Sequence, residues 1–364
     1  MLGGSKPSRR EFLGAGSAGV LTAGRRAFGE APVREYRRGG MVYRPLGQTG
    51  IDVSLLAFGS HTNPADRLPA GPNKTVLTAA GQARRDRMIA HAFDLGVNFL
   101  DVYDNEGQWA PAARLIRERR NKILVSLAHS TTAQEIDRAA RLFGHIDLHR
   151  FLLVNLDSKA LERWDTLRRA KEAGKIRAIG IACHSERSMT TALDQLDGLD
   201  FIMFPYNFIY ARADYSQFLP AALSQGVGLI AMKPLAAGSI MKLDARARPG
   251  AKPEDDSIKL WDRQNKPILP AAVAELTKSL DRMPDETLCM AAMRFVYSRP
   301  FLGSVIAGMF EDRLLEDNYK ALARSYELLP NAQAALDAAR RVAELRGTNW
   351  LPAQYRWLEE EWRA

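Results

Sequence analysis

The stretch Gly96-Val97-Asn98-Phe99-Leu100-Asp101 decides how this chain folds, because it marks the passage from a helix to a short buried strand. Before it, residues 82–95 carry apolar side chains at three- and four-residue spacing, which is typical of an amphipathic helix. After the glycine comes a short apolar run that ends at an aspartate. Similar short apolar runs recur, and we predict strands at residues 53–58, 99–101, 123–127, 151–155, 178–182, 201–204, 228–232 and 304–306.

Helical patterns alternate with these predicted strands. They cover residues 82–95, 132–143, 159–173, 186–196, 216–225, 286–298 and 311–328. Eight strands that alternate with helices pair in parallel, with right-handed crossovers. The sequence therefore predicts an α/β protein with a closed (β/α)8 barrel, the TIM barrel. A doubly wound open sheet is the alternative, but no Gly-x-Gly-x-x-Gly motif opens a first helix.

Composition and charge exclude several classes of protein. The chain has 364 residues, 46% of them hydrophobic, so it can bury the core of one large domain or at most two. The formal charge is +9, of which residues 1–30 supply a net +3. No dense Lys/Arg block with interleaved aromatics follows, which argues against nucleic-acid binding. Cys183 and Cys289 show no zinc or iron–sulfur spacing and are expected to be buried free thiols, although one disulfide is the alternative.

The N-terminus carries an export pattern. Ser8-Arg9-Arg10-Glu11-Phe12-Leu13 leads into a modest apolar run, residues 12–24, that is too short for a membrane span. We interpret residues 1–31 as a twin-arginine signal peptide; a disordered basic tail is the alternative. This predicts the twin-arginine export machinery as a partner, a periplasmic location and no stable membrane insertion after cleavage. Such substrates are exported folded, and outside the inner membrane there is no pool of free NADPH to exchange with. A redox enzyme there would therefore have to hold its nucleotide tightly or use none.

Five segments, taken together and in order, resemble the aldo-keto reductase family. They are Tyr43-Arg44-Pro45-Leu46-Gly47, Gly96-Val97-Asn98-Phe99-Leu100-Asp101, Ala178-Ile179-Gly180-Ile181, Pro234-Leu235-Ala236-Ala237-Gly238 and Glu316-Asp317-Asn318. The resemblance implies a barrel over residues 41–330. An insert at about 240–284 is too long for a plain loop, and a helical tail is expected at 331–364.

The resemblance also implies a catalytic group that this chain has altered. The family places a proton-donating tyrosine five residues after the aspartate, a lysine at the next strand end and a histidine one strand later. Here Asp101 is kept, while the other positions hold Glu106, Ala128 with His129 beside it, and Asn155. Tyr103, two residues from Asp101, is expected to project differently.

We predict that Asp101, Glu106, His129 and Asn155 form the catalytic group. In this hypothesis Glu106 is the general acid, its pKa raised by burial beside Asp101. Asn155 contacts the substrate oxygen.

The expected nucleotide side is altered as well. By the resemblance, the residues in contact with a nicotinamide nucleotide are Cys183, Met203, Met232, Pro234, Leu235, Gly238, Gly308 and Asn318. The small-residue loop at 234–238 is expected to let backbone N–H groups approach a pyrophosphate. Arg313 is the nearby cation for a 2′-phosphate. The cofactor is therefore NAD(P), of undetermined kind, with no nucleotide at all as the alternative.

Three of the six histidines fall at predicted strand ends. His61, His184 and Lys233 are predicted to contact a small-molecule substrate at the mouth of the barrel. Structural histidines, a structural ion pair of Lys233 and a metal site were the alternatives; we predict no metal.

The sequence favours an oxidoreductase of the aldo-keto reductase superfamily that acts on a carbonyl or alcohol with an altered catalytic group. Hydrolase motifs are absent. The alternative is a redox-inactive barrel that binds a small molecule or performs acid–base chemistry without hydride transfer.

Overall fold

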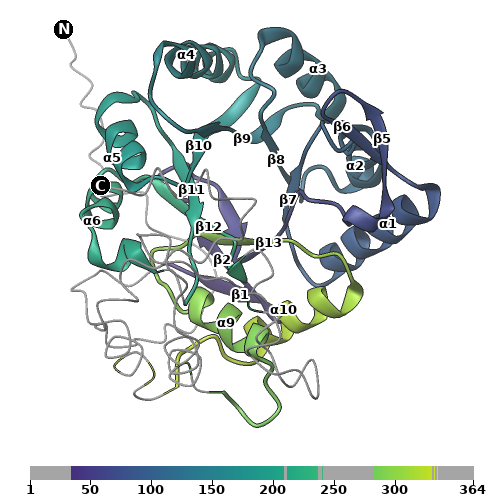
Figure 1. The fold of residues 1–364 in the computed structure, drawn as a ribbon, viewed down its shortest axis with the longest axis vertical. Coiled ribbons are helices and arrows are strands. Elements are labelled where there is room, and N and C mark those ends of the chain that lie inside the picture. Colours follow the sequence, from purple (N-terminus) through teal and green to yellow (C-terminus); the bar gives the residue numbers. More distant parts are fainter. Residues whose placement is uncertain are drawn as a thin grey trace, which may run out of the picture.

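The computed structural model describes residues 34–208, 211–236 and 282–329, together with Ile240, Leu280, Ala332 and Ala334. Within them, parallel strands close into a barrel in the order β10-β11-β12-β13-β4-β7-β8-β9. These strands are β4 (Leu56–Phe58), β7 (Phe99–Val102), β8 (Leu124–Ala128), β9 (Ile146–Leu153), β10 (Ile176–Cys183), β11 (Phe201–Pro205), β12 (Gly228–Met232) and β13 (Ser304–Ala307). The predicted (β/α)8 barrel is confirmed (Figure 1).

Helices surround this ring of strands (Figure 1). They are α1 (Ala79–Asp94), α2 (Trp109–Ile116), α3 (Ala133–Phe143), α4 (Ser158–Glu172), α5 (Glu186–Gln195), α6 (Phe218–Ser224), α9 (Leu288–Tyr297) and α10 (Asp312–Arg324). Short 3-10 turns add η1 (Pro64–Asp66), η2 (Arg117–Arg119) and η3 (Arg212–Tyr215). Local sequence fixes several helix starts; Thr132 and Glu135, for example, form a reciprocal capping box at α3. Helix α2 was not predicted, because its eight residues are too few to show a clear period.

An antiparallel sheet closes the barrel at the amino ends of its strands. It consists of β1 (Tyr36–Arg38), β2 (Met41–Pro45) and β3 (Asp52–Ser54), and Leu46 from its β2–β3 turn packs into the barrel interior. Gly47, at φ +54°, is required in this turn, because a Cβ there would lie 2.4 Å from the carbonyl oxygen of Gly226. The predicted strand 53–58 is therefore two strands, β3 below the barrel and β4 within it.

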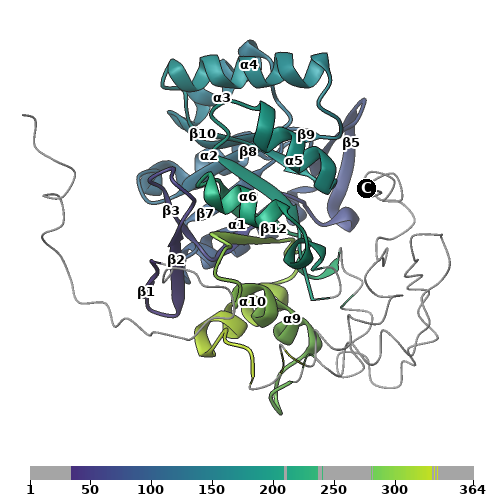
Figure 2. The same cartoon turned by 90° about the vertical axis from the view of Figure 1, so that its left-hand side faces the viewer.

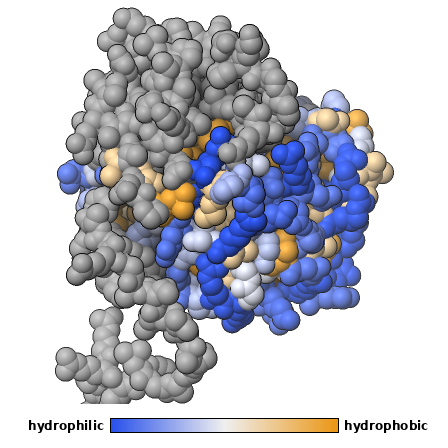
Figure 3. All heavy atoms as spheres, turned by 90° about the horizontal axis from the view of Figure 1, so that it is seen from below, coloured by the Kyte–Doolittle hydropathy of each residue, from blue (hydrophilic) through white to orange (hydrophobic). Residues whose placement is uncertain are grey.

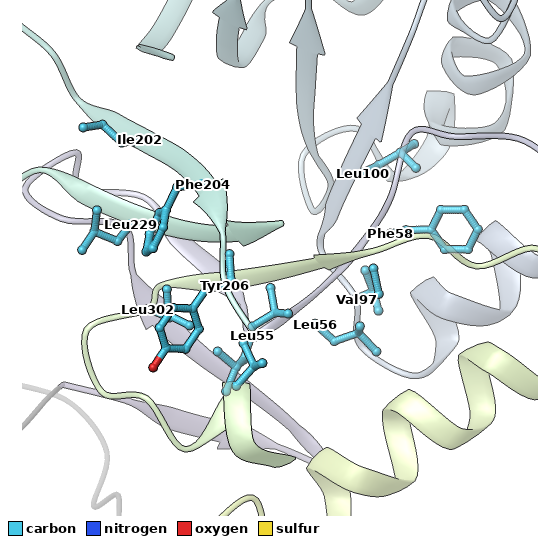
Figure 4. Packing of buried hydrophobic residues seen from close by; sticks show 14 of the residues in the cluster. Leu55, Leu56, Phe58, Val97, Leu100, Ile202, Phe204, Tyr206, Leu229 and Leu302 are labelled. Atoms are coloured by element: carbon cyan, nitrogen blue, oxygen red, sulfur yellow. The ribbon is translucent and has the colours of Figure 1, made fainter. Parts of the chain in front are cut away.

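Two apolar clusters hold the barrel together. An inner cluster fills the interior with side chains such as Ala57, Phe99 and Leu148, while a larger outer cluster lies between strands and helices. Figure 4 shows part of the outer cluster, where Leu55, Leu56 and Phe58 lie near Val97 and Leu100. The two clusters follow from strand alternation, since successive residues face opposite sides.

A second hairpin was not predicted. Strands β5 (Arg67–Gly71) and β6 (Lys74–Leu77) follow β4 and pair around a turn in which Asn73 has a φ of +54°. Figure 2 shows β5 on the opposite side of the barrel from β1–β3, so this hairpin stands at the carboxyl ends of the strands. The Thr75 amide donates to the Asn105 carbonyl at 2.8 Å, which joins the hairpin to the loop after β7.

Some sequence predictions fall outside the described residues. The predicted signal peptide and Gly238 lie outside them, as do nearly all of the insert and the C-terminal tail. In the part of the chain that the structure describes, no helix is long and apolar enough to cross a membrane. The described surface visible in Figure 3 is largely hydrophilic, with small hydrophobic areas.

Candidate active site

A buried ion pair lies inside the barrel near the carboxyl ends of β7 and β9. Asp101 and Arg150 both face inward, because Phe99 and Leu148, two residues earlier on the same strands, belong to the inner cluster. Their exposed fractions are only 1% and 2%. Arg150 Nη1 and Nη2 donate to Asp101 Oδ1 and Oδ2 at 2.6 and 2.7 Å. This bidentate geometry fixes both side chains.

Neighbouring hydroxyls complete the ion pair. Arg150 Nη1 also donates to Ser126 Oγ at 2.8 Å, and the Ser126 and Ser60 side chains both act to lower the pKa of Asp101. Burial acts to raise the pKa of Asp101, but Arg150 and the hydrogen bonds outweigh it, so the pKa is lowered. Burial acts to lower the pKa of Arg150, but the Asp101 charge outweighs it and the pKa rises. Both groups therefore stay charged at neutral pH.

Tyr103 lies against this ion pair, and its position corrects a sequence prediction. The Arg150 guanidinium carbon is 5.9 Å from its ring centroid, and the side chains of Ser60 and Arg150 both act to lower the pKa of its hydroxyl. The expectation that Tyr103 projects differently from Asp101 is wrong, because residues two apart on an extended chain point to the same side. Burial raises the pKa of Tyr103, and Arg150 and the hydrogen bonds oppose that rise without cancelling it.

Two imidazoles flank the Tyr103 ring at the mouth of the barrel. The His61 and His129 rings meet it edge-on, with centroid distances of 5.1 and 5.3 Å. Both histidines are exposed residues. Although His129 keeps accessible surface, the burial of its imidazole and then the Arg150 charge lower its pKa to about 4. His129 is therefore a neutral group at pH 7, able to accept or pass on a proton.

Glu106 does not behave as the predicted general acid. Its carboxylate accepts from the Thr62 amide and hydroxyl at 2.7 Å each and lies 2.9 Å from His61 Nδ1, with Arg67 3.3 Å away. Burial acts to raise its pKa, but the hydrogen bonds from His61 and Thr62 outweigh it, so the pKa is lowered. The predicted rise is wrong, because the loop after β4, rather than Asp101, supplies the partners of Glu106.

Asn155 lies outside the strand that was expected to present it. β9 ends at Leu153 instead of residue 155, so Asn155 falls two residues beyond the strand and is exposed. The side chain of β9 that packs at the edge of the inner cluster near this end is Leu152. The expected strand boundary was wrong because the apolar run 151–154 hides that β9 begins at Ile146.

A second polar pair stands across the mouth. Lys233 follows the end of β12, His184 follows the end of β10, and Lys233 Nζ lies 2.9 Å from His184 Nε2. Burial lowers the pKa of Lys233 to about 8. Burial and then the charge of Lys233 hold the pKa of His184 well below its ordinary value. The structure thus brings together two residues that the sequence predicted only as separate substrate contacts.

The expected nicotinamide side presents apolar residues. Met203 packs in the inner cluster, and Met232 lies half-buried at its edge. Cys183 packs with the outer cluster, and its thiol donates to the Ser185 carbonyl at 3.3 Å, so it does not belong to the inner wall. Met203 and Met232 can contact a flat ring, but their side chains offer no hydrogen-bond donor to its carboxamide group.

The remaining expected nucleotide contacts are placed as follows. Pro234 and Leu235 are buried directly after β12. Gly308 is exposed after β13, where an added Cβ would meet only the Phe310 ring, at 3.6 Å. Asn318 lies buried in α10, and its side-chain amide nitrogen has no hydrogen-bond partner. The loop after β13 thus leaves backbone room at Gly308, whereas Asn318 is enclosed by the fold.

Arg150 and Tyr103 are the site residues that sequence reasoning missed. Arg150 stands in the middle of β9, where the pattern Asp147-Leu148-His149-Arg150 interrupts an apolar strand with charge. A charged side chain that points into the barrel from a strand needs a buried partner. The charge of Arg150 within an apolar strand could therefore have identified it as a site residue. Within the described part of the chain, no three His, Cys, Asp or Glu side chains are grouped to hold a metal ion.

Comparisons with known proteins agree with this architecture. Residues 78–341, more than half of the chain, match the model of the aldo/keto reductase family. A probable voltage-gated potassium channel subunit beta from Arabidopsis thaliana is 27% identical over 78% of this chain and 91% of its own length. L-galactose dehydrogenase of the same plant is 23% identical over 82% and 95%. An L-glyceraldehyde 3-phosphate reductase from Escherichia coli O157:H7 is 22% identical over 79% and 89%.

Solved structures share the fold. The apo form of an aldo-keto reductase from Bacillus halodurans superimposes with a TM-score of 0.62 at 20% identity, covering 86% of this chain and 99% of that one. Its holo form gives 0.61 at 18% identity, with the same coverage.

Proposed function

Because this chain belongs to the aldo/keto reductase family, we propose that it is an NAD(P)-dependent oxidoreductase of carbonyl or alcohol substrates with an altered catalytic group. One observation carries the proposal. The Tyr103 ring lies beside Arg150, with its centroid 5.9 Å from the guanidinium carbon, and Asp101 fixes that guanidinium inside the mouth of the barrel. A phenol, a fixed cation and a carboxylate are the parts that a tuned proton donor requires.

In this proposal Tyr103 gives its proton to the carbonyl oxygen of the substrate. When bound, a reduced nicotinamide supplies the hydride for the carbonyl carbon. Tyr103 is fully protonated at neutral pH, because burial raises its pKa. Arg150 stabilises the phenolate that remains after proton transfer, since a positive charge in a buried site acts through a low dielectric. Asp101 holds Arg150 in place and carries no proton itself, because its pKa is lowered.

Two further groups support the proton donor. His129 is neutral at pH 7, with a pKa of about 4, and its ring touches Tyr103, so it can return a proton to the phenolate. Arg85 of α1 holds the loop after β4 by donating to the carbonyl groups of Gly59, Ser60 and His61 at 3.1–3.2 Å. That loop supplies Ser60, whose side chain acts to lower the pKa of both Asp101 and Tyr103.

The residues fit a nicotinamide nucleotide in part. The exposed Gly308 backbone leaves open space for a phosphate, because an added Cβ there would meet nothing closer than 3.6 Å. Met203 and Met232 offer apolar contact to a ring. We propose NAD rather than NADP, because Arg313 is already 3.5 Å from Asp317, and Glu311 and Asp312 place negative charge where α10 begins.

The proposal includes export by the twin-arginine pathway to the periplasm, with cleavage near residue 31. The paired Arg9 and Arg10 before an apolar run support it. Replacing both arginines by lysine in the full chain should leave the protein in the cytoplasm, as cell fractionation would reveal. Unchanged export of that variant would rule this pathway out.

The decisive experiment tests directly whether the protein binds a nicotinamide nucleotide. The full chain is purified folded, denatured, and searched for released NAD(P); the folded protein is then titrated with NADH and NADPH while its tryptophan fluorescence is followed. We expect released nucleotide or micromolar binding, tighter for NADH. If neither occurs, the oxidoreductase proposal fails.

A redox-inactive barrel is the second candidate. The apolar residues on the expected nicotinamide side favour it, because Met203 and Met232 make no hydrogen bond to a carboxamide. In that case the Tyr103 site would serve ligand binding or acid–base chemistry without hydride transfer. Nucleotide release separates the two candidates without knowledge of the substrate.

A further inference from the structure

The pair formed by Lys233 and His184 has the geometry of a nucleophile beside its base. Lys233 Nζ and His184 Nε2 are 2.9 Å apart, and the side chains come from the ends of two strands, β12 and β10, that flank β11. His184 is buried, with 5% of its surface exposed, while Lys233 keeps partial access to solvent. Reactive groups of barrel enzymes stand at these carboxyl ends.

The backbone holds Lys233 in an unusual conformation. Its φ is +55°, which is rare for a residue with a side chain. The Lys233 carbonyl accepts from Asn207 Nδ2 at 3.1 Å and from the Ala236 amide at 3.0 Å, and the preceding Met232 carbonyl accepts from the Tyr206 amide at 3.1 Å. Strain that surrounding contacts maintain is a feature of functional sites.

The environment of the pair favours uncharged nitrogen atoms. Met203 belongs to the apolar inner cluster and Met232, which precedes Lys233, packs against it. Burial lowers the pKa of Lys233 to about 8, so part of the amine is neutral at pH 7. His184 is neutral because its pKa is held well below the ordinary value by burial and then by Lys233. Its Nδ1 is buried and has no hydrogen-bond partner.

We propose that Lys233 is a nucleophilic amine that forms an imine with a small aldehyde or ketone, with His184 as the base that moves the proton. Desolvated lysines beside a base are the amines that perform this chemistry in proteins. The reaction is distinct from the proposed hydride transfer and requires no nucleotide.

The step balances without an oxidant or reductant. The neutral Lys233 nitrogen attacks the carbonyl carbon and forms a C–N bond, while the C=O π electrons move to oxygen. His184 Nε2 accepts the proton released by nitrogen and delivers it to that oxygen, which gives a carbinolamine. The nitrogen lone pair then forms the C=N bond as the C–O bond breaks. His184 takes the remaining N–H proton, which ends on the leaving hydroxide and makes it water. Amine and carbonyl thus become imine and water.

The test traps the imine on the intact chain without nucleotide. The protein is incubated at pH 7 with glycolaldehyde, or with dihydroxyacetone, and sodium cyanoborohydride, and peptide mass mapping locates the alkylated lysines. We expect Lys233 to be modified at least about tenfold faster than the exposed Lys159 of α4, because more of its amine is neutral.

Three variants make the test specific. His184→Gln should slow modification of Lys233 by about tenfold or more and leave Lys159 unchanged. Lys233→Met should remove the fast phase of labelling, while Lys159→Arg should not. Equal modification rates for Lys233 and Lys159 in the wild-type chain would overturn the proposal, even if the variants failed to fold. Fast trapping in a chain that binds no nucleotide would support this inference and reject only the hydride-transfer function.

Discussion

The two halves of the barrel mouth solve opposite electrostatic problems. In the β7–β9 half, the charges of Asp101 and Arg150 cancel in a bidentate pair that Ser126 and Ser60 complete. In the β10–β12 half, Lys233 faces a neutral imidazole, His184, at 2.9 Å. Burial acts to lower the pKa of both basic groups. At Arg150 the Asp101 charge outweighs it and the pKa rises, whereas at Lys233 burial lowers the pKa to about 8.

This difference teaches that burial alone does not determine the state of a basic side chain. A buried cation with a carboxylate partner keeps its charge, whereas a buried amine beside a neutral base gives up part of it. The first half is therefore suited to stabilising charge that develops on a substrate, and the second half to supplying an uncharged nucleophile. The predictions below begin with the ion pair of the first half and then move outward from it.

The largest effect is expected from breaking the ion pair. Arg150→Met leaves Asp101 buried without its partner, and we expect the free energy of unfolding at pH 7 to fall by about 3–5 kcal/mol. Urea unfolding followed by circular dichroism measures it. As the matched control, the double variant Asp101→Leu/Arg150→Met should lose much less, because no unpaired charge remains. Equal losses in the single and double variants would show that the pair is not electrostatically coupled.

Tyr103→Phe tests the function of the same half. We expect turnover of small carbonyls with NADH to fall about 100-fold, because the proton donor is gone while the ring packing is kept. The free energy of unfolding should change by less than about 1.5 kcal/mol, since one hydrogen-bonding hydroxyl is lost. A Tyr103→Phe enzyme that retains full turnover would exclude Tyr103 as the acid.

We predict that His149, on the outer face of β9, makes the stability of the protein depend on pH. Burial lowers the pKa of His149 to about 3, below its unfolded value of about 6.5, so the unfolded chain binds the proton more readily. Its contribution is fully present above pH 6.5 and is lost as the pH falls towards 3, by up to about 1.4 kcal/mol per pH unit. His149→Leu should flatten the acid limb of urea-unfolding free energies between pH 6.5 and 4. An unchanged slope would mean that this histidine is not the group responsible.

Glu106→Gln sharpens the assignment within the first half. Because the carboxylate is held by Thr62 and His61 and its pKa is lowered, we expect turnover to stay within about threefold of wild type, unlike Tyr103→Phe. The unfolding free energy should fall by about 1 kcal/mol through the weakened contacts to Thr62 and Arg67. A loss of turnover comparable to that of Tyr103→Phe would restore Glu106 as the acid.

The smallest expected effect is on the preference between NADH and NADPH, which we attribute to residues of α10. We expect NADH to bind a few-fold more tightly than NADPH, because Asp317 lies 3.5 Å from Arg313. Asp317→Asn should release that cation and improve NADPH affinity by about threefold, as fluorescence titration at fixed ionic strength would measure. NADPH affinity that does not change would place the 2′-phosphate elsewhere.

The sequence by itself determined the architecture. Short apolar runs and helical periodicity are local properties, so the barrel strands and most of the helices could be located before any contact was known. Asp101 could be placed at a strand end for the same reason. Boundaries were less secure: the apolar run at 151–154 moved the predicted end of β9 beyond Leu153 and brought the exposed Asn155 into the expected site.

Only the tertiary structure decided which side chains meet. Arg150 is 49 residues from Asp101 along the chain, and Lys233 is 49 residues from His184, yet the closed barrel makes both pairs neighbours. No local pattern carries such contacts, because they depend on strand register and on which face of each strand is turned inward. The protonation states follow from them, since desolvation and partner charges exist only once the barrel has closed.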